Sequence, residues 1–333
     1  MQNGKIVATL RQNIQLLTRL AVLMGTALVA GILFQIKTHV FFNGGNLQSI
    51  LLFMTSVAIV GYGMTIIVVA GELDLSVGST YGLASMSAAL LWKGGMHFLL
   101  AAFLGVLVGA LAGLINGLIV TKLRVNSFIA TLGTLNLYGG ITLWISHNVA
   151  MSPGNELPGF KIYAFIGTSS PIGLPIQIYW LMFFSPIMWF ILHRSLFGFR
   201  VAAIGGNKVA AQSAHMPVTR IKLYAFTLTG ALAGIAGIID FSLVSSVSPT
   251  AGSTVMFSVL AAVIIGGAAL SGGRGTIIGT IAGVFLLAVL TNGLGLLGAG
   301  AFAQLVFQGA VILIAISTDS LVGRKRQNSE VQM

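Results

Sequence analysis

The chain has 333 residues, of which 56% are hydrophobic and only 7% are charged, a composition typical of a membrane protein with several spans rather than of a soluble domain. It has 17 basic and six acidic residues, but the basic ones lie between apolar segments, so we expect no nucleic-acid partner. The sequence has no cysteine, and its five histidines lack the spacing of metal ligands, so no metal site is expected. It also has no P-loop and no set of catalytic residues, so ATP hydrolysis would belong to another chain.

Apolar segments predict an all-α, polytopic integral membrane protein of about ten transmembrane helices in one domain, residues 1–333. With the N-terminus in the cytoplasm, 14 of the 17 basic residues fall inside, as the positive-inside rule requires. Both termini are then cytoplasmic, residues 1–19 as an N-terminal segment and residues 323–333 as a tail. No clear cleavage site follows the first apolar segment, which we expect to be retained as a span. The expected spans are 20–36, 47–70, 75–92, 97–120, 127–146, 178–193, 221–245, 255–270, 276–297 and 301–318.

Two carboxylates, Glu72 and Asp74, interrupt the second apolar region in the string Gly71-Glu72-Leu73-Asp74-Leu75-Ser76-Val77-Gly78. A carboxylate beside a span is costly unless something satisfies it. Asp74 is predicted to cap a helix starting at Leu75, where free N–H groups and the helix dipole favour an anion. The alternative is a proton relay or a substrate contact. No nucleophile or metal ligand is near in sequence, so a catalytic carboxylate pair is not expected.

Small and amide side chains mark the predicted helix contacts. Asn126 is expected to cap the fifth span, whereas Asn116 lies inside the fourth and is expected to hydrogen-bond across helices. Glycines at a spacing of four residues lie on one face of a helix, where backbones approach closely. Such a face serves either static packing or a moving interface. The two sets are Gly105, Gly109, Gly113 and Gly117, and Gly275, Gly279 and Gly283.

Two further features lie on the extracytoplasmic side or within a span. The segment 147–177 contains four prolines and is expected to be irregular, either as a docking surface for an extracytoplasmic partner or as a simple connector. Asp240 lies deep in an apolar run without a local cation. It is expected either to face the interior, where it would line a path for a hydroxylated solute together with Phe241, or to snorkel to the outer interface.

The interval 194–222 lies between two apolar runs and carries five basic residues and no acid, so we place it in the cytoplasm. Gly205-Gly206 is expected to break the chain, and Asn207 to cap a short helix over residues 208–214 that ends before Pro217. Two interpretations are open: the short helix docks into a groove of another protein, or the interval is a solvated connecting loop.

Several strings resemble the permease subunits of ribose-type, monosaccharide ABC importers, and together they extend from about Leu47 to Ile316. The string G-x-x-D-L-S-V-G from Gly71 is a specific match, because eight residues of mixed polarity rarely coincide. The others are G-G-N-x-x-A-A with V-x-R-I-K after it, I-N-G-L-I-V-T-K-L-R-V-N-S-F-I-A-T-L-G-T from Ile115, Ala261–Thr280, and N-G-L-G-L-L-G from Asn292.

This resemblance implies a multi-pass permease in the bacterial inner membrane that works by alternating access and is not itself an enzyme. The implied partners are a cytoplasmic ATPase subunit that binds ATP and Mg, an extracytoplasmic solute-binding protein, and a second permease copy in a homodimer or heterodimer. The chain itself is expected to bind no cofactor. Relatives of this kind serve ribose, other sugars and sugar-derived signals, so the solute stays open. The rival interpretations are an ion-coupled secondary transporter that uses Glu72, Asp74 or Asp240, and a membrane-embedded enzyme.

The resemblance also assigns residues. Val209 stands where the family often has Glu, and His215 where it usually has Gly. The residues implied in coupling to the ATPase are Gly206, Asn207, Lys208, Val209, Ala210, Ala211, His215 and Arg220. The residues expected along the translocation pathway, or as structural polar groups, are Glu72, Asp74, Ser76, Asn116, Asp240, Phe241 and Asn292.

Overall fold

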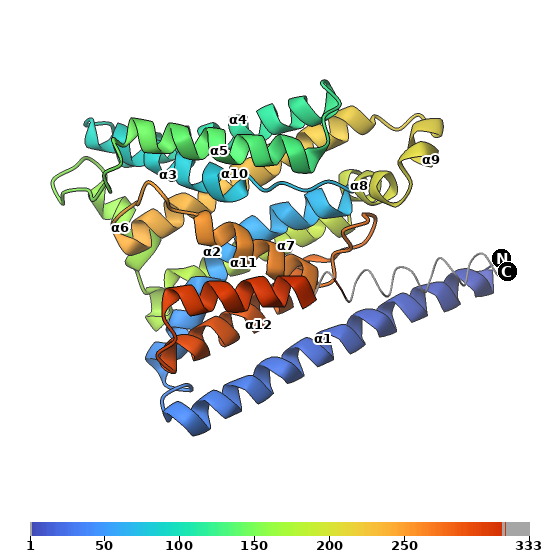
Figure 1. Ribbon diagram of the computed structural model, residues 1–333, viewed down its shortest axis with the longest axis horizontal. Helices are drawn as coiled ribbons and strands as arrows, with labels where there is room; N and C mark the ends of the chain where they lie inside the picture. The colour runs from blue at the N-terminus through green and yellow to red at the C-terminus, as the bar shows by residue number, and fades with distance from the viewer. Residues whose placement is uncertain (1, 315–316, 318–333) are drawn as a thin grey trace.

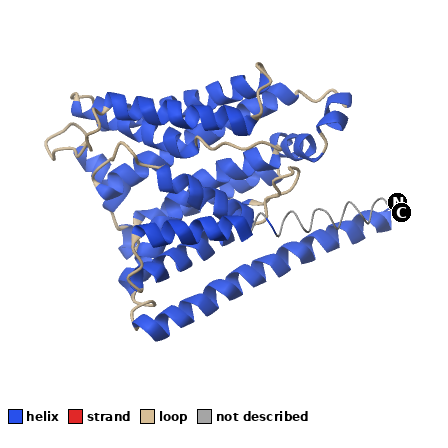
Figure 2. Cartoon of the chain, viewed as in Figure 1, coloured by secondary structure: helices blue, strands red, loops and turns tan. Residues whose placement is uncertain are grey.

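The computed structural model describes residues 2–314 and 317, with side chains described for residue 14 and from residue 17 onward (Figure 1). The predicted tail, 323–333, and the end of the tenth predicted span lie outside these residues. Within the described part the chain is helical, with one isolated antiparallel bridge between Met151 and Val247 (Figure 2). The all-α prediction is therefore confirmed for this part of the chain.

Each predicted span contains a helix. In the described residues, seven helices are long and apolar enough to cross a membrane: Leu17–Thr38 of α1, and α2, α4, α5, α7, α10 and α12. The helices at three other predicted spans are shorter, so the polytopic membrane fold is established while the count of ten stays a prediction. The elements are α1 (Gln2–Thr38), α2 (Gly44–Val69), α3 (Val77–Lys93), α4 (Phe98–Thr121), α5 (Ser127–Ile145), α6 (Phe160–Thr168), η1 (Pro171–Gly173), α7 (Ile176–His193), α8 (Leu196–Gly206), α9 (Lys208–Ser213), α10 (Val218–Val244), α11 (Ser253–Ile265), α12 (Ile277–Leu296) and a last helix, Ala301–Ile314.

Helix α2 forms the centre of the bundle. It is apolar around its whole circumference, as a helix surrounded by others must be, and 89% of its most apolar stretch is buried. It packs against α7, α10, α11 and α12, while α4 and α5 cover the far side of α3 and α10 (Figure 1). Helix α1 lies outermost, against α12, and its apolar stretch is only 17% buried.

The glycine faces are helix contacts, as their spacing predicts. A Cβ on Gly113 of α4 would lie 2.2 Å from the carbonyl oxygen of Phe226 in α10, and one on Gly109 would lie 2.5 Å from that of Gly230. In the second set, a Cβ on Gly283 of α12 would lie 2.1 Å from the Ala262 oxygen of α11, and one on Gly279 would lie 2.2 Å from the Gly266 oxygen, whereas Gly275 precedes α12 and is not on a helix face. Backbones can approach this closely only where no side chain intervenes.

The segment 147–177 is not irregular throughout, because it contains α6. That helix is anchored by Tyr163, which is 1% exposed and donates a hydrogen bond to the Phe241 carbonyl at 2.7 Å. Trp92 packs on the same ring and donates to the Pro158 carbonyl at 2.8 Å. Phe241 belongs to this buried aromatic cluster and is 2% exposed, so the expectation that it lines a solute path is wrong. The proline content of the segment predicted an irregular backbone, but contacts with buried aromatic side chains of other helices hold α6 in place.

Candidate functional site

Three segments that are distant in sequence meet at one end of the bundle. They are the end of α2, the end of α8 and the connection between α11 and α12. Gly273 donates its N–H to the Val69 carbonyl at 2.8 Å, and a Cβ on Gly205 would lie 1.8 Å from the same oxygen. A Cβ on Gly272 would lie 2.9 Å from the Cα of Gly71. These five residues form direct backbone contacts, and we call them the glycine junction.

Helix α8 precedes the short helix and was not expected from the sequence. Gly205-Gly206 forms its last turn rather than a simple break, and the chain changes direction at Asn207, which has an extended backbone. The Asn207 side chain accepts a hydrogen bond from the Ala210 N–H at 2.9 Å, so the predicted cap of α9 is confirmed.

The two faces of α9 differ. Lys208, Val209 and Ala210 are exposed, Val209 at 72%. Ala211 is only 4% exposed and packs in the core of the protein itself, so its expected place on a docking surface is wrong. The helical period turns Ala210 outward and Ala211 inward.

Helix α9 ends at Ser213, one residue before the predicted end. His215 follows in the left-handed conformation, with φ of 54°, and is exposed. Glycine adopts this conformation without a steric cost and is common just after a helix, so glycine would suit the backbone at this position better than histidine does. Arg220 is exposed at the start of α10.

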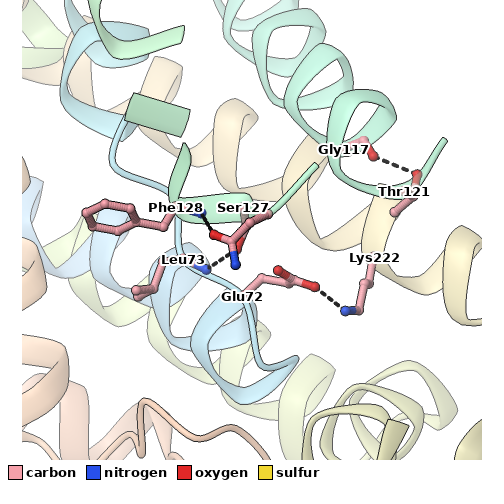
Figure 3. A network of polar contacts seen from close by, with 8 residues as sticks. Glu72, Leu73, Gly117, Thr121, Ser127, Phe128 and Lys222 are labelled. Carbon is pink, nitrogen blue, oxygen red and sulfur yellow. Dashed lines mark hydrogen bonds and ion pairs between the residues drawn. The ribbon is translucent and has the colours of Figure 1, made fainter. Parts of the chain in front are cut away.

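Glu72 is paired with Lys222, a partner that the sequence analysis did not find. The side chains are 14% and 7% exposed, and the pair joins the segment 70–76 to the first turns of α10 (Figure 3). Lys222 lies 150 residues further along the chain. The sequence analysis used its charge only to assign the orientation of the chain in the membrane. Breaking an ion pair with so little exposure leaves an uncompensated buried charge, so the pair fixes the position of the two segments relative to each other.

A cleft of about 980 Å³ opens beside this ion pair. Its walls come from five parts of the chain: the segment after α2, the end of α4 with the turn to α5, the α8–α9 region, the start of α10, and the connection between α11 and α12. Arg124 and Lys208 add two positive charges to the wall. The lining residues are Ala70, Gly71, Glu72, Val120, Thr121, Arg124, Val125, Asn126, Ile204, Gly205, Lys208, Val209, Gln212, Val218, Thr219, Lys222 and Ser271.

The segment 70–76 is non-helical, and α5 satisfies its backbone. Ser127 accepts a hydrogen bond from the Leu73 N–H at 3.2 Å (Figure 3), and Thr131 accepts one from the Leu75 N–H at 3.1 Å. Irregular backbone beside membrane spans requires such partners from the protein. Asn126 caps α5 as predicted, through the Phe128 N–H at 2.9 Å.

Asp74 does not cap a helix at Leu75, because α3 begins two residues later, at Val77. Its carboxylate instead accepts hydrogen bonds from the Ser76 N–H at 2.8 Å and the Ser76 hydroxyl at 2.7 Å. Asn116 donates to Ser76 at 2.7 Å, as expected for a contact across helices, and accepts from the Tyr138 hydroxyl at 3.1 Å. Asp74, Ser76 and Asn116 are 1%, 0% and 0% exposed, so this network is internal and joins α3, α4 and α5.

Asp240 faces the interior of the bundle and does not snorkel to the surface. The Ser56 hydroxyl of α2 and the Tyr81 hydroxyl of α3 both donate hydrogen bonds to its carboxylate. Neither partner is recognisable in the sequence, since hydroxyl side chains are common in spans and these lie more than 150 residues away.

Asn292 lies at the opposite end of the bundle from α9, where its amide donates to Asn46 at 2.9 Å. The predicted polar residues therefore do not form a single site but four separate groups: Glu72, the Asp74 network, Asp240 and Asn292. Among the described residues, no three His, Asp or Glu side chains lie close enough together to hold a metal ion.

Comparisons with known proteins identify the family. Residues 46–316 match the family model described as branched-chain amino acid transport system / permease component. The chain is 39% identical over 264 residues to the ribose import permease protein RbsC of Bacillus subtilis, covering 78% of this chain and 80% of that protein. It is 31% identical to the D-allose transport system permease protein AlsC of Escherichia coli, covering 90% of each. It is 32% identical to the autoinducer 2 import system permease protein LsrD of Photorhabdus temperata, covering 84% and 85%.

Proposed function

The chain belongs to this family of transport-system permease components, and within it to the ribose-type permeases, and we propose that it carries a monosaccharide or a related small hydroxylated solute across the membrane. It is a transport subunit of an ABC importer rather than an enzyme. The relatives named for ribose, D-allose and autoinducer 2 support a hydroxylated solute over an amino acid.

The proposed arrangement has ten crossings, with both termini and residues 194–222 in the cytoplasm of a bacterial cell and the chain in the inner membrane. The split of the basic residues supports this orientation, since only Lys37, Lys93 and Lys161 fall outside. Helix α9, the glycine junction and the cleft then all lie at the cytoplasmic end.

The proposed partners are a cytoplasmic ATPase subunit, which binds ATP and Mg, an extracytoplasmic solute-binding protein and a second permease copy. ATP binding would draw the ATPases together, and α9 would pass the motion to the spans so that the pathway opens first outward and then inward. The single observation that carries this proposal is the position of α9. It presents Ala210 to the outside, while α8 just before it makes backbone contact with α2 through Gly205.

The motion would enter the bundle at two points. At the glycine junction, α8 touches both the end of α2 and the α11–α12 connection without intervening side chains. At the ion pair, Glu72 ties the segment after α2 to Lys222 in α10. A displacement of α8 and α9 is therefore transmitted to α2, α10 and α12 together.

Reconstitution tests the function. The permease is placed in liposomes with its ATPase, and uptake of radiolabelled ribose, allose and leucine is measured with the binding protein on the opposite side. We expect sugar uptake that requires ATP on the ATPase side. Uptake driven by a proton gradient in the absence of ATP would instead support the secondary transporter, in which Glu72, Asp74 or Asp240 carries the proton.

A further inference from the structure

Two basic elements line the cleft beside the ion pair of Glu72 and Lys222. Helix α9 contributes Lys208, and the turn between α4 and α5 contributes Arg124. The volume of about 980 Å³ lies at the upper end of the range for binding sites, so several side chains of another molecule can enter. We call this cleft the basic cleft.

The positive charge of the basic cleft is not compensated within the described part of the chain. Glu72 is already paired with Lys222, with 14% and 7% of the side chains exposed (Figure 3). Neither Arg124 nor Lys208 forms an ion pair with another described residue. None of the other described acidic residues lines the cleft, and these are Asp74, Glu156 and Asp240.

The turn between α4 and α5 holds Arg124 in place. Only residues 122–126 connect the two helices. At one end of the turn the Lys122 N–H donates to the Leu118 carbonyl at 2.8 Å, and at the other end Asn126 caps α5. Arg124 is exposed between these two fixed points, so its position follows that of the two spans.

Docking on α9 would bury these charges. In the proposed arrangement the ATPase covers the exposed residues of α9, and one of them, Val209, also lines the basic cleft. A partner that covers Val209 therefore removes water from Lys208 and from Arg124 as well. A cation that is removed from water needs an anion beside it. The described part of the chain supplies none, so the docked protein has to supply it.

We propose that a carboxylate-bearing segment of the ATPase enters the basic cleft and pairs with Arg124 and Lys208. The inference rests on the proposed docking at α9 and adds the α4–α5 turn as a second contact. That contact would give the motion of the ATPase a separate route into the bundle. Helix α5, which follows the turn, holds the segment 70–76 through Ser127 and Thr131.

Removing one charge from the turn tests the proposal. Arg124→Gln should weaken binding of the ATPase to the detergent-solubilised permease by about thirtyfold or more, as for a buried charge pair. Arg124→Lys keeps the charge and should retain most of the affinity. Lys122→Gln is the matched control, because Lys122 is an exposed cation of the same turn that does not line the cleft. Its loss should change the affinity by no more than about fivefold, as for an exposed charge.

A second measurement leaves both cations of the cleft in place. The chain has no cysteine, so Thr219→Cys gives a single thiol in the cleft wall, and Ser170→Cys gives an exposed thiol elsewhere. Saturating ATPase should slow the reaction of a maleimide with the thiol at 219 and not at 170. Protection at 219 by phosphatidylglycerol without the ATPase would assign the cleft to an anionic lipid headgroup and overturn the proposal.

The remaining outcomes separate this inference from the docking of α9. Equal losses of affinity in the Arg124→Gln and Lys122→Gln proteins, or labelling at 219 that the ATPase does not slow, would overturn the insertion into the cleft. If Ala210→Arg still abolishes ATPase binding in that case, the docking of α9 stands. If Ala210→Arg has no effect either, the proposed coupling through α9 falls with it.

Discussion

The ion pair between Glu72 and Lys222 can be broken from one side by Lys222→Met. The methionine side chain keeps most of the volume of lysine but removes the charge, so Glu72 remains with 14% exposure and no cation. We expect a loss of stability, because the carboxylate keeps its desolvation cost and loses the attraction that offset it.

The magnitude follows from the geometry of the pair. At an ordinary ion-pair separation of about 3 Å and an effective dielectric constant of about 20, the attraction is about 5.5 kcal/mol. Water reaches part of Glu72 and reduces the loss, so we expect Lys222→Met to cost about 3 kcal/mol, at the lower end of the range for broken buried pairs. Glu72→Leu alone should cost a similar amount, because Lys222 is only 7% exposed. The double variant should lie within about 1 kcal/mol of wild type, since an apolar pair leaves no unpaired charge.

The assay is thermal denaturation of the detergent-solubilised permease, in which each single variant should lower the apparent Tm by on the order of 5 °C or more. Lys93→Met is the control, because Lys93 is exposed at the end of α3 and its loss should change little. The reasoning fails if the double variant costs as much as the two single variants added together, since the two residues would then act independently.

Four further predictions concern orientation, the buried network and the short helix. Lys161→Cys should react with an impermeant maleimide in intact cells and Lys208→Cys should not; the reverse pattern would refute the proposed orientation. Asp74→Ala leaves the Ser76 donors unsatisfied, so it should lower the free energy of unfolding by about 1–3 kcal/mol and reduce the yield of folded protein. Asp74→Asn keeps an acceptor and should retain folding and transport. Loss of transport in a well-folded Asp74→Asn protein would indicate a role for the charge. His215→Gly should relieve the cost of the left-handed backbone, which raises the free energy of unfolding by about 1–2 kcal/mol and therefore raises the apparent Tm. An unchanged or lower Tm would show that the strain is absent. The Ala210→Arg protein should insert into the membrane normally but should no longer recover the ATPase in a pull-down. Val149→Arg is the control, because Val149 is exposed at the opposite end of the bundle and its replacement should leave ATPase recovery unchanged. Undiminished recovery by the Ala210→Arg protein, together with normal uptake, would show that α9 is only a connector.

Local signals in the sequence were sufficient to predict much of the fold. The caps at Asn126 and Asn207 depend on residues two or three positions away, and both were predicted. The glycine faces depend on a helical period and were also predicted. Each of these features can be recognised within about four turns of one helix.

Contacts between distant segments were not predicted. Nothing near Glu72 indicates Lys222, and nothing near Asp240 indicates Ser56 or Tyr81, because these pairs exist only once the helices are packed. The start of α3 was misplaced for the same reason. The Leu75 N–H bonds to Thr131 of α5, so the backbone there is held by another helix and does not begin its own.

Helix α2 links the two ends of the bundle. Its first turn carries Asn46, which accepts a hydrogen bond from Asn292 of α12, and directly after its end Ala70 and Gly71 line the cleft beside α9. Its 26 residues span about 39 Å, enough to cross the apolar part of a bilayer. The helix contains no proline, and a Cβ on Gly63 would lie 2.8 Å from the Thr229 Cα of α10, so its middle is closely packed. A helix held in this way moves as a rigid body more readily than it bends, and a displacement imposed at the glycine junction would therefore reach the contact between Asn46 and Asn292 at the other end.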